Sequence, residues 1–178
     1  MQGLNAVIAS NLVLYGILIL AVILDFKYMK ISNRLILMGI ILALAFQVII
    51  GRGVSDFIHV LCNIFFPVIV LYLFYLMGVI GAGDVKLFSV IGGFVNFREL
   101  VLCMLCSFVV GAVISLGKML FCGTLLEGLH NAGCYFWGLA KGEYRTYGRG
   151  SKEKRNRIHF SLAIVLGLSL AKVYLQFY

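Results

Sequence analysis

Residues 6–24 read AVIASNLVLYGILILAVIL and contain no charged side chain. Because an α-helix rises about 1.5 Å per residue, a run of this length can cross the roughly 30 Å hydrocarbon core of a bilayer. No basic stretch precedes the run, and no small-residue cleavage site follows it before Asp25. We therefore interpret it as a retained transmembrane helix and not as a cleaved signal peptide.

Five more apolar runs follow along the chain. They cover residues 35–50, 57–79, 85–97, 100–122 and 158–175. The chain is 62% hydrophobic and 12% charged, whereas soluble domains average about 45–50% apolar and 25% charged residues. A soluble fold of this size cannot bury so much apolar surface. The sequence therefore predicts an all-α integral membrane protein with about six transmembrane helices, forming one domain over residues 1–178.

Lysine and arginine are distributed unevenly between the two sets of connections. Most of them lie in residues 25–34, 81–86 and 123–157. The opposite side has Arg52, Arg98 and Lys172. Because basic loops face the cytoplasm, we predict a multi-pass protein of the inner (cytoplasmic) membrane with both termini outside. Residues 123–157 are predicted to be a cytoplasmic basic, amphipathic loop at the lipid headgroups. The net charge of +8 then indicates a lipid bilayer as partner, and no nucleic acid.

The chain has three aspartates, and two of them fall at the predicted cytoplasmic ends of helices. Asp25 closes the first apolar run and Asp84 opens the fourth, whereas Asp56 lies in an outside turn. Ionisable groups at such positions are costly in a membrane and therefore often functional. Gly81 and Gly83 precede Asp84, and glycines allow another segment to approach closely. We interpret Asp25 and Asp84 as a candidate catalytic pair.

The stretch from Gly81 to Leu87, GAGDVKL, resembles the G-x-G-D-x-K-L motif of type IV prepilin peptidases, a group of GxGD membrane aspartyl proteases. Asp25 with the later Ile31-Ser32-Asn33 resembles the second signature of that family, with serine in place of the usual proline. Residues 158–164, IHFSLAI, are similar to a third segment, with His159 in place of proline. The resemblance spans nearly the whole chain.

This resemblance implies a membrane aspartyl endopeptidase that removes the leader peptide from prepilin or pseudopilin substrates at the cytoplasmic membrane face. It implies Asp25 and Asp84 as catalytic residues. Four further residues are expected to support the site, namely Gly81, Gly83, Lys86 and Asn33. The chain resembles the short members of tight-adherence (Flp-type) pilus systems, so we expect no methyltransferase activity. We also expect no cofactor and no metal, and the oligomeric state is left open.

The roles within this site have alternatives. Lys86 either orients the loop, stabilises a developing negative charge, or serves only as a topology residue. Asn33 is expected to cap the second helix, and His159 to have a structural role. The helix dipole favours an anion at a helix N-terminus and disfavours one at a C-terminus. We therefore expect resting Asp84 to be the ionised base and Asp25 the protonated acid.

Other functions are compatible with parts of the sequence. A small ion-coupled transporter would use Asp25 and Asp84 at broken helices to bind cations. An inactive pilus-assembly membrane factor would keep the fold without the chemistry. Cys103 and Cys106 form a C-x-x-C pair, which would suit a thiol–disulfide enzyme, but the surrounding run supplies no polar partner for such chemistry.

Overall fold

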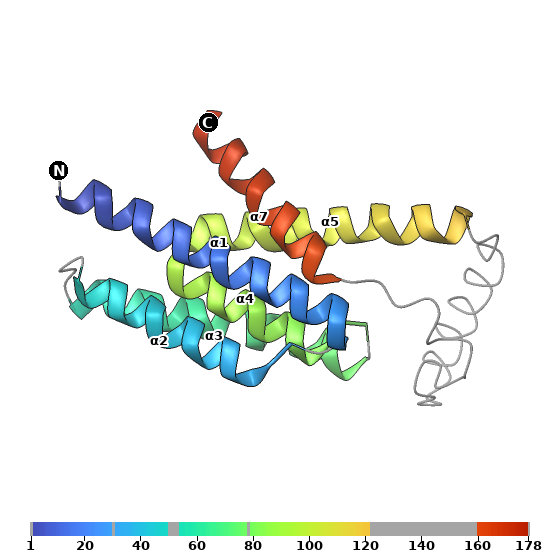
Figure 1. Cartoon of the computed structure of the whole chain (residues 1–178), viewed down its shortest axis with the longest axis horizontal. Helices are drawn as coiled ribbons and strands as arrows, with labels where there is room; N and C mark the ends of the chain where they lie inside the picture. The colour runs from blue at the N-terminus through green and yellow to red at the C-terminus, as the bar shows by residue number, and fades with distance from the viewer. Residues whose placement is uncertain (1, 30, 50–53, 78, 122–159, 178) are drawn as a thin grey trace.

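A computed structural model of the chain describes residues 2–29, 31–49, 54–77, 79–121 and 160–177. In these residues the regular structure is entirely helical (Figure 1). The helices are α1 (Gln2–Tyr28), α2 (Asn33–Ile49), α3 (Val54–Leu76), α4 (Ala82–Phe94), α5 (Phe97–Phe121) and α7 (Phe160–Phe177). Each predicted apolar run corresponds to one of these helices. The predicted loop at 123–157, together with His159, lies outside the described residues.

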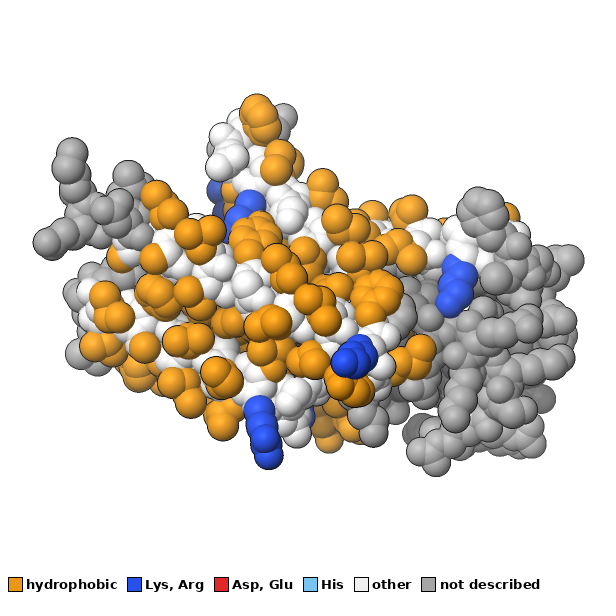
Figure 2. Space-filling view, viewed as in Figure 1, with side chains coloured by type: hydrophobic (Ala, Val, Ile, Leu, Met, Phe, Trp, Pro, Cys, Tyr) orange, Lys and Arg blue, Asp and Glu red, His pale blue; other side chains and the backbone are white. Residues whose placement is uncertain are grey.

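The outer surface of the bundle is apolar. Figure 2 shows hydrophobic side chains over the visible face, with only scattered lysine and arginine among them. Large side chains such as those of Leu12, Ile69 and Val109 are more than 60% exposed. In water such a surface would be unfavourable, at about 25 cal/mol per Å² of apolar area. Lipid removes that penalty, so the fold is confirmed as an all-α integral membrane protein.

Among the helices that the structure describes, four are long and apolar enough to cross a membrane. These are α1, α3, α5 and α7, with candidate spans of 18 to 23 residues. Helix α2 has 17 residues and α4 has 13. At about 1.5 Å per residue, α4 is only about 20 Å long and is too short to cross the hydrocarbon core by itself. The prediction that residues 85–97 form a membrane-crossing helix is therefore not supported, because α4 is too short. It lies inside the bundle, in contact with the other described helices.

Helix α4 is the centre of the described bundle. It contacts α1, α2, α3, α5 and α7, and eight of its 13 residues are buried. A helix that is apolar on every side is typically surrounded by protein. The other helices therefore hold α4 at a fixed position. Its N-terminal end, which carries Asp84, lies where α1 ends and where α2 and α7 begin (Figure 1).

Gly92, near the end of α4, lies directly against the backbone of α3. A Cβ atom at this position would collide with the carbonyl oxygen of Asn63, whose own side chain donates a hydrogen bond from Nδ2 to the carbonyl of Val95 at 3.2 Å. Such a contact cannot be relieved by a side-chain rotation. The absence of a side chain at Gly92 therefore lets α3 and α4 pack closely.

We expect Gly92→Ala to lower the free energy of unfolding by about 1–3 kcal/mol, the usual cost of overpacking. The midpoint of unfolding in mixed detergent and sodium dodecyl sulfate measures the effect. Gly16→Ala is the matched control, because a Cβ there meets nothing within 4 Å. Equal midpoints for the two variants would contradict the close packing of α3 and α4.

Candidate active site

Four helix ends meet at one end of the bundle. The last turn of α1 carries Asp25 and the first turn of α4 carries Asp84. The first turns of α2 and α7 add Asn33 and Ser161. Ser161 contacts Asp25, Lys86 of α4 contacts Asn33, and Gly83 lies against Ile31. These contacts bring the two aspartates predicted from the sequence to the same end of the bundle.

Asp25 lies within α1 and not at its end. The helix continues to Tyr28, and the backbone carbonyl of Asp25 accepts a hydrogen bond from the N–H of Met29 at 2.8 Å. Met29 has φ of 51°, a left-handed conformation that commonly terminates helices. The sequence predicted that the first helix ends at Asp25, whereas in the structure the helix continues for about one more turn, to Tyr28. Its side chain is therefore held by a regular helix on both sides.

Asp84 is the third residue of α4, and Gly81 is the residue that precedes the helix. The carbonyl of Gly81 accepts hydrogen bonds from the N–H groups of Asp84 at 3.1 Å and Val85 at 3.3 Å. In return, the backbone of Gly81 provides a hydrogen bond to the Asp84 carboxylate, an arrangement familiar from capping boxes. A Cβ atom on Gly81 would lie 3.1 Å from Oδ2 of Asp84. Glycine thus leaves room for the carboxylate.

Gly83 brings the connection between α1 and α2 close to the first turn of α4. A Cβ atom at Gly83 would lie 3.3 Å from three side-chain carbons of Ile31, tighter than most such contacts. Ile31 belongs to the segment that follows Asp25. The glycine therefore allows the close approach of a second segment that the sequence pattern suggested.

Lys86 and Asn33 link two of the helix starts. Nζ of Lys86 donates a hydrogen bond to Oδ1 of Asn33 at 2.9 Å. The first turn of α2 has a backbone arrangement in which the carbonyl of Ser32 accepts from the N–H groups of Leu35 and Ile36. Of the alternatives for Lys86, the contact supports an orienting role. The expected capping role of Asn33 is not supported, because α2 begins at Asn33 and Ser32 precedes the helix; the side chain of Asn33 instead accepts the hydrogen bond from Lys86 of α4.

The electrostatics of Asp84 differ from the expectation based on helix dipoles. Asp84 lies outside the four candidate spans. Burial, followed by the negative charge of Asp25, raises the pKa of Asp84 from 3.8 to about 6, although the backbone hydrogen bond from Gly81 lowers it. The dipole contributes only about 0.3–1 kcal/mol, less than one pH unit. Burial therefore outweighs the dipole, and Asp84 keeps its proton to a higher pH than an exposed aspartate does.

Ser161 is a site residue that the sequence analysis did not identify. Its hydroxyl donates a hydrogen bond to Oδ2 of Asp25 at 2.6 Å, across 136 positions of sequence. The side chain is completely buried. In the sequence it is one serine near the start of an apolar run, a position at which serine often serves as a helix cap. Only its place in the segment at residues 158–164 set it apart.

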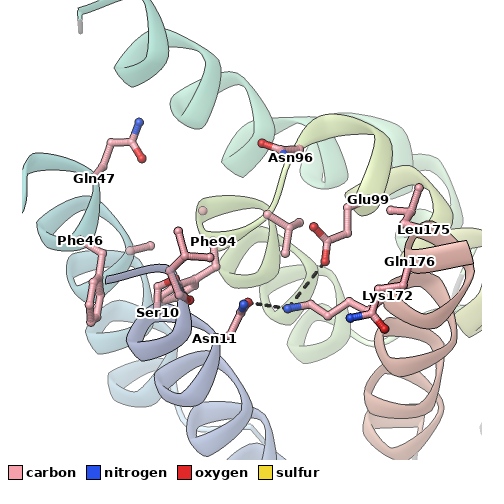
Figure 3. Close-up of a pocket in the computed structure, with 14 residues that line it drawn as sticks. Ser10, Asn11, Phe46, Gln47, Phe94, Asn96, Glu99, Lys172, Leu175 and Gln176 are labelled. Atoms are coloured by element: carbon pink, nitrogen blue, oxygen red, sulfur yellow. Dashed lines mark hydrogen bonds and ion pairs between the residues drawn. The ribbon is translucent and has the colours of Figure 1, made fainter. Parts of the chain in front are cut away.

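A second polar cluster lies at the opposite end of α4. Figure 3 shows Lys172 between Glu99 and Asn11, with Gln47, Asn96 and Gln176 around the same pocket. Nζ of Lys172 is 3.7 Å from Oε1 of Glu99 and donates a hydrogen bond to Asn11. The charges in this pocket are thus paired with each other. Through these contacts Lys172 links α7 to α1 and α5, at the end of the bundle opposite the aspartates.

Cys103 and Cys106 of α5 are both free thiols, not joined by a disulfide. Cys103 is completely buried, and its neighbour Ser107 donates a hydrogen bond to the Cys103 carbonyl at 2.6 Å. Among the described residues, no group of three or more histidine, cysteine or acidic side chains is placed to hold a metal ion. At the described end of the bundle, the structure brings together the carboxyl groups of Asp25 and Asp84 and the hydroxyl of Ser161.

The fold and this site define a helical integral membrane protein with paired carboxyl groups where four helix ends meet. A family model described as the type IV leader peptidase family matches residues 12–116, more than half of the chain. The chain belongs to this family, which supports a peptidase activity. The matched residues include Asp25, Asn33 and Asp84 and end before Ser161. A search of curated proteins and a search of solved structures each found no match.

Proposed function

We propose that this protein is an aspartic endopeptidase of the cytoplasmic membrane that removes leader peptides from prepilin-like proteins. The observation that carries the proposal is the pair of carboxyl groups. Asp25 acts electrostatically on a partly buried Asp84, at one end of a bundle whose surface is apolar. Two interacting carboxyl groups that differ in proton affinity supply a general base and a general acid together.

In the proposed reaction, ionised Asp25 accepts a proton from water as the water oxygen attacks the carbonyl carbon of the scissile peptide bond. Protonated Asp84 then donates its proton to the amide nitrogen, and the carbon–nitrogen bond breaks. The products are the carboxylate of the leader and the new amino terminus of the substrate. This assignment reverses the one based on helix dipoles, because desolvation of Asp84 outweighs the dipole.

The proposed substrate is a protein with a short basic leader followed by an apolar helix. Lateral entry of such a helix fits a bundle with an apolar outer surface. The family membership implies a prepilin-type substrate. The resemblance to the short, Flp-type members is the reason to propose leader cleavage without methyl transfer.

Co-expression of the protein with a candidate prepilin tests the activity. Wild-type protein should increase the gel mobility of the prepilin, and mass spectrometry should place the cut between the basic leader and the apolar helix. Asp25→Ala and Asp84→Ala should leave the precursor intact. A transporter or an inactive assembly factor would give no mobility change with any of the three proteins, and that outcome would reject the proposal.

We expect the end of the bundle that carries the aspartates to face the cytoplasm, because basic residues cluster there in the sequence. Lys27→Cys, at the exposed end of α1, and Asp56→Cys, at the exposed start of α3, can be made in a variant whose five cysteines are replaced by alanine. A membrane-impermeant maleimide should label Lys27→Cys only in inverted vesicles and Asp56→Cys only in right-side-out spheroplasts. The reverse pattern would place the site on the outer face.

A further inference from the structure

The hydroxyl of Ser161 has a specific partner in the candidate active site. It donates a short hydrogen bond of 2.6 Å to Oδ2 of Asp25. Ser161 is completely buried, and Asp25 is half-buried. A buried hydroxyl needs a hydrogen-bond partner. This hydroxyl satisfies that need by contacting a carboxylate on another helix.

Serines within helices commonly donate to the carbonyl one turn earlier in the same helix. Ser169, eight residues further along α7, does so and donates to the carbonyl of Val165 at 2.9 Å. Ser89 and Ser107 make the same kind of bond within α4 and α5. Ser161 departs from this pattern by reaching α1. Its hydroxyl therefore acts between helices at the site.

Helix α7 is held in place by contacts that do not involve this hydroxyl. The ring of Phe160 lies 5.8 Å from that of Phe108 and 6.4 Å from that of Phe88, measured between centroids. Gly167 packs directly against Ser107 of α5. The hydrogen bond to Asp25 is thus an addition to a helix that is already packed. Its removal should change the carboxylate more than the fold.

We propose that Ser161 is a positioning residue that holds the Asp25 carboxylate, the proposed general base, in one orientation. This inference rests on the proposed function for its catalytic consequence. The hydroxyl of Ser161 occupies Oδ2 of Asp25 and fixes the direction of the carboxyl group relative to the first turn of α4. The carboxylate is therefore oriented before substrate arrives.

The variant Ser161→Ala removes only the hydroxyl, and Ser161→Thr restores one. Leader cleavage is measured with the full-length protein in liposomes and a prepilin substrate, from pH 4.5 to 9. We expect Ser161→Ala to lower kcat/KM about tenfold to a hundredfold, the effect of losing a hydrogen bond to a charged group. Ser161→Thr should recover most of the activity.

Ser169→Ala is the matched control, because it removes a hydroxyl from the same helix without touching Asp25. It should retain the activity and pH profile of the wild type. If Ser161→Ala has the wild-type activity, or if its activity falls only in proportion to the amount of folded protein, Ser161 has no positioning role. Failure of Ser161→Thr to recover activity, in a folded protein, would likewise overturn the proposal.

A direct measurement separates this inference from the proposed function. Infrared spectra of the Asp84→Asn background, with and without the Ser161→Ala change, follow the carboxylate stretching band of Asp25. Removal of the hydroxyl should shift the frequency of this band, because the carboxylate loses a hydrogen-bond donor. An unchanged band frequency would refute the role of Ser161. An absence of cleavage in the wild type, with the infrared shift present, would instead refute only the peptidase function.

Discussion

Asp25→Asn and Asp84→Asn are each expected to lower kcat/KM for leader cleavage by about 10²–10⁴-fold or more. A positioned general acid or base typically contributes a factor of that size. Asparagine has nearly the shape of aspartate, so the packing around the site should be retained. Rates are measured with purified protein in liposomes, under conditions in which each enzyme molecule turns over once.

The double variant Asp25→Asn with Asp84→Asn should be scarcely slower than either single variant, because residues that act as a unit are not additive. Asp56→Asn is the matched control. Asp56 is the third aspartate of the chain and is exposed in the first turn of α3. A normal rate for either single active-site variant would remove that carboxyl group from the reaction. A further hundredfold loss in the double variant would show that the two groups act independently.

Activity should decline as the pH rises above about 6. Burial and the charge of Asp25 raise the pKa of Asp84 to about 6, and the proposed mechanism requires its protonated form. The protonated fraction falls tenfold for each pH unit above the pKa. At pH 8 the value of kcat/KM should therefore be about a hundredfold below its maximum. The pH dependence of kcat/KM reports the free enzyme and is the quantity to measure.

The sign of this dependence distinguishes the two assignments of acid and base. If Asp84 were the ionised base, as the helix dipole alone suggests, activity would rise as the pH passed through 6. Asp84→Glu serves as a control, since it keeps a titratable group while changing its position. Circular dichroism at each pH would show that the protein stays folded over the range. A flat profile between pH 5 and 8 would reject Asp84 as a group that titrates in the reaction.

Much of the fold was predictable because apolar run length is a local property. The runs ahead of Asp25 and after Asn33 became α1 and α2, within a few residues. The motif around Asp84 also predicted a close approach of another segment, and Ile31 makes it at Gly83. Run length could not show that α4 is enclosed by the other helices. The enclosure of α4 depends on contacts with helices that are distant in the sequence, and the local sequence of α4 does not show these contacts.

The sequence by itself determined a helical membrane protein, its family, and two aspartates near the ends of separate helices. These follow from composition, run length and a short motif, all of which are read over a few consecutive residues. Only the tertiary structure decided that Ser161 donates to Asp25 and that burial raises the pKa of Asp84. The physical reason is that desolvation and hydrogen bonding depend on atoms from distant parts of the chain, which meet only when the helices pack.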